Sequence, residues 1–201
     1  MNKLEILKII DENNGYLTSQ LIKKYKIETV YITRLVKENK LTKVARGIYI
    51  SSKGVEDFLY ITYLLHSNLV YSGDTALFLN GLSNKQFPEY EAVIKYGQFV
   101  PSINNINVTC SRKRTFDLGI IELETMFGNK VKCYDKERSI CDLFLRPDHY
   151  DYEDRIYAIN EYNNYYLDLK KLYDYAARLG VYNEVKNVYE VIIWNKKGQS
   201  V

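Results

Sequence analysis

The sequence has few of the residues that mark disulfide-linked or metal-bound proteins. Only three of its 201 residues are cysteines, Cys110, Cys133 and Cys141, and they form no CxxC pair. An odd, dispersed set of this kind argues against a disulfide framework or a zinc site. The two histidines, His66 and His149, are isolated and lack metal-ligand spacing. We therefore expect free, buried thiols and no metal or other cofactor.

Long apolar runs are missing as well. The longest, FLYITYLL at residues 58–65, is far below the roughly 20 residues that a membrane span requires. The N-terminus lacks the small-residue cleavage site of a signal peptide. With only three prolines and no low-complexity tract, the composition predicts a globular protein of the cytoplasm with no membrane partner.

The usual catalytic motifs are also missing. The sequence contains no Walker A, GxGxxG, HExxH or GxSxG pattern. It has no Gly-Ser pair followed by the spaced carboxylates with which a nucleotidyltransferase holds Mg²⁺. The one carboxylate cluster, DYED at residues 151–154, precedes a helical pattern, where the helix dipole favours acidic side chains. We predict that the protein is not an enzyme and has no catalytic residues.

The charge that is present is unevenly distributed. Residues 1–54 hold 11 of the 28 Lys and Arg residues and 5 of the 25 Asp and Glu residues, a net charge of +6, whereas residues 55–201 carry −3. A basic region attached to a mildly acidic one predicts that the first region contacts a polyanion. We expect a DNA-binding domain over residues 1–54 and a second domain over residues 55–201.

The basic region has the pattern of a winged helix-turn-helix. An amphipathic helix opens the chain, and Thr18 can cap a short second helix. A third helix is expected from Thr29. Two strand-like runs, residues 41–44 and 48–51, then flank a tight turn in which Gly47 can supply a positive φ. Three helices followed by a hairpin is the element order of this DNA-binding fold.

The third helix carries a candidate reading surface. Ile32 and Leu35 share one face and should be buried, which turns Arg34 and Lys37 outward. Guanidinium, ammonium and hydroxyl groups on such a face suit base edges and phosphates in a major groove. The candidate DNA-binding residues are Tyr31, Thr33, Arg34 and Lys37 on the helix, with Lys43 and Arg46 in the hairpin. The alternative is a protein-docking face on which the cations are incidental.

Residues 55–201 mix helical and strand patterns. Four β-like runs, at residues 92–96, 106–110, 119–124 and 130–134, predict a small sheet. Asp135 and Asp168 can cap two of the helices that follow, and Asp74 or Thr75 a short helix before the sheet. The predicted fold class is α+β: an N-terminal winged helix-turn-helix, then a mixed α+β domain with a small sheet and C-terminal helices.

Two further clusters of charge stand in the second region. Arg112, Lys113 and Arg114 follow a predicted strand and are candidates for a DNA or partner contact, although a solvated loop explains them equally well. Arg138 and Asp142 are four residues apart in a helical pattern. We expect a local salt bridge between them rather than a partner contact.

With these residues laid out, the chain resembles the AbiEi family of antitoxins. The resemblance rests on the order of four segments: KVARGIYI, YSGDTALFLNGLS, YDKERSICDLF and DLKKLYDYAARLG. It implies a protein that binds inverted repeats in its own promoter, with Thr33, Arg34, Lys37 and Arg46 as DNA contacts. It further implies that the second domain counteracts a nucleotidyltransferase toxin, AbiEii, in a type IV, phage abortive-infection system, without a stable complex between the two proteins.

Two other functions remain open on the sequence. One is an ordinary winged-helix transcriptional regulator whose C-terminal domain senses a ligand or another protein. The other is an enzyme with a DNA-targeting domain, which the missing catalytic motifs disfavour. A neighbouring gene for a nucleotidyltransferase would separate the antitoxin from the ordinary regulator.

Overall fold

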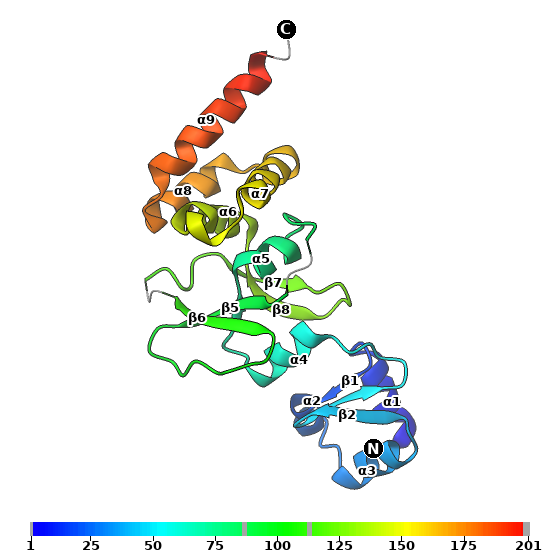
Figure 1. The fold of residues 1–201 in the computed structure, drawn as a ribbon. Coiled ribbons are helices and arrows are strands. Elements are labelled where there is room, and N and C mark those ends of the chain that lie inside the picture. The colour runs from blue at the N-terminus through cyan, green and yellow to red at the C-terminus, as the bar shows by residue number, and fades with distance from the viewer. Residues whose placement is uncertain (1, 86–87, 112–113, 199–201) are drawn as a thin grey trace. The chain divides into compact units, whose positions relative to one another are not determined.

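The chain divides into two compact units (Figure 1). The computed structural model describes residues 2–85, 88–111 and 114–198. Unit 1 consists of residues 1–67 and 124–131, and unit 2 of residues 68–123 and 132–201. Both units combine helices with a sheet, so the predicted α+β class is confirmed. The functional boundary at residue 54 stays a prediction, because the compact unit that contains residues 1–54 also takes in two later segments.

Unit 1 has the element order of a winged helix-turn-helix, as predicted. Its elements are α1 (Lys3–Asp11), β1 (Tyr16–Thr18), α2 (Ser19–Lys24), α3 (Thr29–Lys37), β2 (Leu41–Ala45), β3 (Ile48–Ser51) and α4 (Phe58–Leu65). The strands form an antiparallel sheet in the order β1–β3–β2. Thr18 caps α2, because its hydroxyl oxygen accepts a hydrogen bond from the Leu21 amide at 3.3 Å.

Both faces of this small sheet are covered within unit 1. Successive strand residues point to opposite faces. Leu17 therefore packs into a core shared with α1, α2 and α3, whereas Tyr16 and Ile50 pack with apolar side chains of α4. The strand β1 was not predicted from the sequence. All three of its residues are buried, so its residues do not alternate between apolar and polar in the way that marks a half-exposed strand.

Unit 2 contains a five-stranded mixed sheet with the order β6–β5–β4–β8–β7. Its strands are β4 (Val70–Tyr71), β5 (Tyr90–Lys95), β6 (Ile106–Ser111), β7 (Ile120–Glu124) and β8 (Lys130–Tyr134). The four predicted strands are confirmed, and β4 is an addition that lies in the centre of the sheet. It has only two residues and pairs with β5 on one side and β8 on the other.

The helices of unit 2 build its main core. They are α5 (Gly73–Leu79), α6 (Lys136–Leu145), the 3-10 turn η1 (Pro147–His149), α7 (Tyr152–Tyr165), α8 (Leu169–Leu179) and α9 (Tyr182–Gly198). Helix α6 packs against α5, α7, α8 and α9 (Figure 1). Its Ile140, Cys141 and Leu143 side chains are fully buried in this core. No helix in the described part of the chain is both long and apolar enough to cross a membrane.

Most predicted helix caps are confirmed, and two local expectations are wrong. The carboxylates of Asp135 and Asp168 accept from backbone amides in the first turns of α6 and α8. Neither Asp74 nor Thr75 caps α5, because the helix already begins at Gly73. Ser72 occupies the N-cap position. The free thiols of Cys133 and Cys141 are buried as expected, but that of Cys110, near the end of β6, is exposed.

Candidate nucleic-acid interface

The orientation of α3 is set by the residues that it buries. Ile32 and Leu35 lie in the core of unit 1, which places the other side of the helix in solvent. Arg34 and Lys37 are exposed on that side. Val30 lies with them and is 58% exposed, although it is apolar. The helix thus presents cations beside a small apolar side chain, a combination that suits phosphates and thymine methyl groups.

Thr33 and Tyr31 are more constrained than their positions in the sequence suggest. The Thr33 side chain is exposed, but its hydroxyl donates to the Thr29 carbonyl oxygen at 3.0 Å. Its hydroxyl oxygen is therefore left to accept a hydrogen bond, while its proton is engaged within the helix. Tyr31 is half-buried and packs against the core of unit 1, so only part of its ring is available to a ligand.

The β2–β3 turn, or wing, is fixed by a contact with α2. Gly47 adopts a φ of +71°, as the tight turn requires. The Ser19 hydroxyl at the start of α2 donates to the Gly47 carbonyl oxygen at 3.2 Å. Arg46 and Lys43 are exposed in this hairpin. Ser19 is not among the residues predicted from the sequence, because its contact joins residues 28 positions apart and leaves no local signal.

The one acidic side chain at the end of α3 is already paired. Glu38 forms ion pairs with Lys3 and with Lys40, the latter at 3.6 Å. The hydrogen bond from Lys3 holds the pKa of Glu38 below its usual value. Among the described residues, neither Arg34 nor Lys37 takes part in an ion pair. Their charges are therefore not neutralised by an acidic side chain of the described residues.

The other predicted basic cluster lies in unit 2. Arg114 is exposed in the turn that precedes β7. Arg112 and Lys113, which belong to the same prediction, lie outside the described residues. The proposed contact by this cluster therefore stays a prediction.

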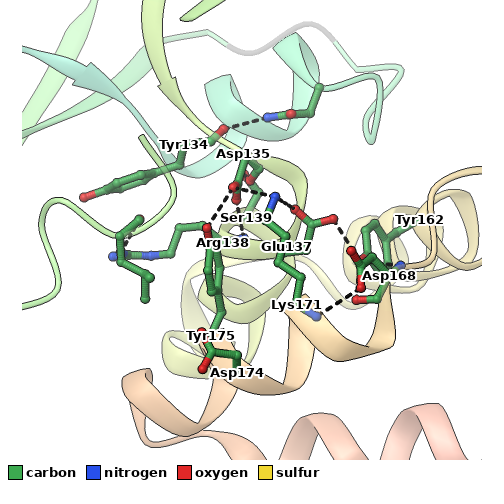
Figure 2. A network of polar contacts seen from close by, with 12 residues as sticks. Tyr134, Asp135, Glu137, Arg138, Ser139, Tyr162, Asp168, Lys171, Asp174 and Tyr175 are labelled. Carbon is green, nitrogen blue, oxygen red and sulfur yellow. Dashed lines mark hydrogen bonds and ion pairs between the residues drawn. The ribbon is translucent and has the colours of Figure 1, made fainter. Parts of the chain in front are cut away.

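The start of α6 carries a network of buried polar contacts (Figure 2). Asp135 accepts from the Arg138 amide at 2.9 Å and from the Tyr175 hydroxyl at 3.2 Å. The Lys171 ammonium lies 3.0 Å from the Asp135 carboxylate and 2.7 Å from the Glu137 carboxylate. The carboxylates of Asp135 and Glu137 are thus both neutralised by one cation, Lys171 of α8.

Arg138 is the most enclosed cation of this network. Its side chain is almost fully buried, and its Nε lies 3.0 Å from the Asp142 carboxylate one turn along α6. Its Nη1 donates to the carbonyl oxygens of Thr115, at 2.6 Å, and Leu118, at 3.2 Å. The predicted local salt bridge is confirmed. Because the pair also fixes the turn before β7, it holds α6 to that turn rather than facing outward.

The chemistry of this network is structural. Burial raises the pKa of Asp142, against the opposing effect of the Arg138 and Arg146 cations. Burial also raises the pKa of the Cys133 and Cys141 thiols, which keeps them protonated and unreactive.

A cavity of about 240 Å³ opens beside the network in unit 2. Arg138 and Asp142 form part of its wall, together with Arg146 and Tyr134. Hydroxyl groups of β6 and of the following turn complete it, from Thr109, Ser111 and Thr115. Charged, hydroxyl and apolar side chains are mixed in its lining, and its volume lies just below the roughly 300 Å³ of the smallest ordinary ligand pockets.

Unit 1 thus combines the element order of a winged helix-turn-helix with exposed cations on α3 and in the wing. Residues 5–52 match the family model described as "Transcriptional regulator, AbiEi antitoxin". This match confirms the resemblance for the N-terminal quarter of the chain. A solved structure with a similar fold is that of the Rv2827c protein from Mycobacterium tuberculosis, at 10% sequence identity and a TM-score of 0.54, covering 86% of this chain and 70% of that one. No curated protein matches the chain.

Proposed function

We propose that this protein is the antitoxin of a type IV toxin–antitoxin system, and that it represses its own operon by binding inverted repeats in the promoter. Helix α3 enters the major groove and the wing contacts the backbone or the minor groove. Unit 2 counteracts a nucleotidyltransferase toxin without a stable complex. The protein acts in the cytoplasm in phage defence, and it has no catalytic role.

The observation that carries this proposal is the exposed, unpaired cationic face of α3 within the segment that matches the AbiEi regulators. Arg34 and Lys37 face solvent on one side of the helix, and Arg46 is exposed at the tip of the wing. Since the neighbouring Glu38 is bound to two lysines, it does not neutralise this surface. A cationic helix face beside a basic wing is the electrostatic footprint of DNA binding.

Operator binding tests the first half of the proposal. We expect the full chain to bind its own promoter DNA in a gel-shift titration. Arg34→Ala should weaken that binding by about 1–3 kcal/mol, because a bidentate contact to guanine is lost. Arg178→Ala is the matched control, since it removes an exposed arginine of α8. Equal affinity of Arg34→Ala and the wild type would contradict the role of α3.

Growth rescue tests the second half. Co-expression with the adjacent gene product should restore growth to cells that are poisoned by that product alone. The same cells should yield no stable complex of the two proteins on purification. Rescue should persist in Arg34→Ala, since unit 2 carries the neutralising activity. Loss of rescue in this variant, at unchanged protein level, would contradict the division of labour.

The cavity of unit 2 supports a second candidate function, a winged-helix regulator that senses a small ligand. Its wall contains two guanidinium groups, one buried carboxylate and several hydroxyls. A ligand bound there would change operator affinity without any toxin. A chain that represses its promoter, responds to a small molecule and fails to rescue growth would favour this function over the antitoxin.

A further inference from the structure

A short segment between β7 and β8 belongs to unit 1, although the strands beside it lie in the sheet of unit 2. Residues 124–131 group with residues 1–67, whereas most of β7 and β8 group with the rest of the chain. The chain therefore crosses between the two units three times rather than once. We call residues 124–131 the tip segment.

The tip segment is held by a buried carboxylate of unit 1. Asp57 is 1% exposed. Its Oδ2 accepts from the Thr125 hydroxyl at 2.5 Å and from the Asn129 amide nitrogen at 2.8 Å. Its Oδ1 accepts from the Tyr60 amide at 3.1 Å, at the start of α4. A buried carboxylate is costly unless donors surround it, so these three hydrogen bonds form one interdependent group.

A second tie joins the tip segment to the turn between α1 and β1. The Asn14 side-chain amide donates to the Gly128 carbonyl oxygen at 3.0 Å and to the Asn129 side-chain oxygen at 3.1 Å. Asn14 has a φ of +53°, and Gly15 follows it with +82°. The turn is thus formed by two residues in the left-handed region, and its geometry is fixed from outside by the tip segment.

The hydrogen bonds of Asp57 and those of Asn14 both connect the tip segment to β1, which pairs with β3 beside the wing. The backbone amide of Asp57 donates to the Tyr16 hydroxyl at 2.8 Å, and that hydroxyl donates to the Val55 carbonyl oxygen at 2.7 Å. Tyr16 opens β1, which pairs along its length with β3, so that Thr18 lies opposite Ile48, directly after the wing turn. A displacement of β1 therefore moves β3 and, with it, the wing.

We propose that Thr125, Asn129 and Asp57 are positioning residues for the wing, so that operator affinity depends on the tip segment. This inference rests on the proposed function, because it concerns DNA binding by unit 1. Among the described residues, the side-chain hydrogen bonds between the tip segment and the rest of unit 1 go to Asp57 and Asn14 and not to α3. The effect of the tip segment passes through β1 and β3 to Arg46, and it makes DNA binding depend on a segment that is encoded within the second half of the chain.

The test uses the full chain and compares two conservative substitutions of Thr125. Thr125→Val removes the hydroxyl that donates to Asp57, whereas Thr125→Ser keeps it. We expect Thr125→Val to bind promoter DNA about three- to tenfold more weakly and Thr125→Ser to bind like the wild type. Melting temperature and circular dichroism establish that each variant is folded at the assay temperature.

Double-mutant cycles separate wing positioning from general loosening. Thr125→Val and Arg46→Ala should be strongly non-additive, because a misplaced wing has already lost its contact. Thr125→Val and Arg34→Ala should be additive, because α3 docks independently of the wing. Additivity in both cycles, or wild-type affinity of Thr125→Val, would overturn the inference. Absence of any promoter binding by the wild type would instead overturn the proposed function.

Asn14→Gly keeps the test decisive if Thr125→Val does not fold. Glycine tolerates the positive φ of this position, so the substitution removes the two hydrogen bonds without straining the turn. Asn105→Gly is its matched control, since Asn105 has a similar φ of +62° in unit 2. We expect Asn14→Gly to bind promoter DNA more weakly than the wild type, and Asn105→Gly to bind like the wild type. Equal affinity of the two variants would overturn the inference.

Discussion

Arg34 on α3 and Arg138 on α6 show two opposite uses of one residue type. Arg34 is exposed and has no ion pair among the residues that the structure describes. Arg138 is 3% exposed, pairs with Asp142 and donates to two backbone carbonyl groups. The first charge has no acidic partner in the described part of the chain, while the second joins α6 to the turn before β7.

The difference follows from what surrounds each helix. One face of α3 meets a core, whereas α6 is enclosed by four helices. A charge on an enclosed helix must find its partners inside the protein, because an unpaired buried charge is strongly unfavourable. A charge on a half-exposed helix needs none. Burial of the helix, rather than the local residue pattern, therefore decides which arginine is available to bind.

The largest effect should come from breaking the buried pair. Arg138→Met leaves the Asp142 carboxylate buried without its cation, and we expect a loss of about 3–5 kcal/mol in the free energy of unfolding. Urea denaturation of the full chain measures this loss. Arg138→Met combined with Asp142→Leu should recover most of it, because no charge then remains unpaired. Equal losses in the single and double variants would contradict the structural role of the pair.

A smaller effect is expected at Asp74, a half-buried acid of unit 2. Burial, and then the nearby Glu91 carboxylate, raise its pKa to about 6. Because the folded state holds this proton more tightly than the unfolded state, Asp74 costs stability as the pH rises from about 4 to about 6. Asp74→Asn should therefore stabilise the protein by about 1 kcal/mol at pH 7.5 and by much less at pH 4.5, since partial exposure limits the full linkage.

Thermal or urea unfolding at the two pH values measures this difference. Asp148→Asn is the control, because Asp148 is an exposed acid of the same unit. It should change stability little at either pH. A stabilisation by Asp74→Asn that is equal at both pH values would show that Asp74 is ionised at pH 4.5 and would contradict the raised pKa.

The sequence was informative wherever a short-range pattern determines the structure. Thr18, Asp135 and Asp168 were predicted as helix caps, because each precedes an amphipathic run and its partner lies three residues away. The buried face of α3 followed from the spacing of Ile32 and Leu35. These local rules were enough to predict the winged helix-turn-helix and the exposure of its cations.

The sequence was silent wherever distant segments meet. Asp57 caps α4 in the structure. Nothing near it indicates that Thr125 and Asn129, 68 and 72 residues later, also bind its carboxylate. The two-residue strand β4 was not predicted for a similar reason, since both strands that pair with it, β5 and β8, come later in the chain. Such contacts are set by tertiary packing.

The central claim is that the exposed cations of unit 1 bind DNA phosphates and bases. Its most direct test is the salt dependence of promoter affinity for the wild type and for the triple variant Arg34→Ala, Lys37→Ala, Arg46→Ala. Each lost phosphate contact lowers the log–log slope by about 0.9, so with Lys37 and Arg46 on phosphates we expect the triple variant to lose about 2 units of slope. A triple variant with the slope and affinity of the wild type would contradict the account.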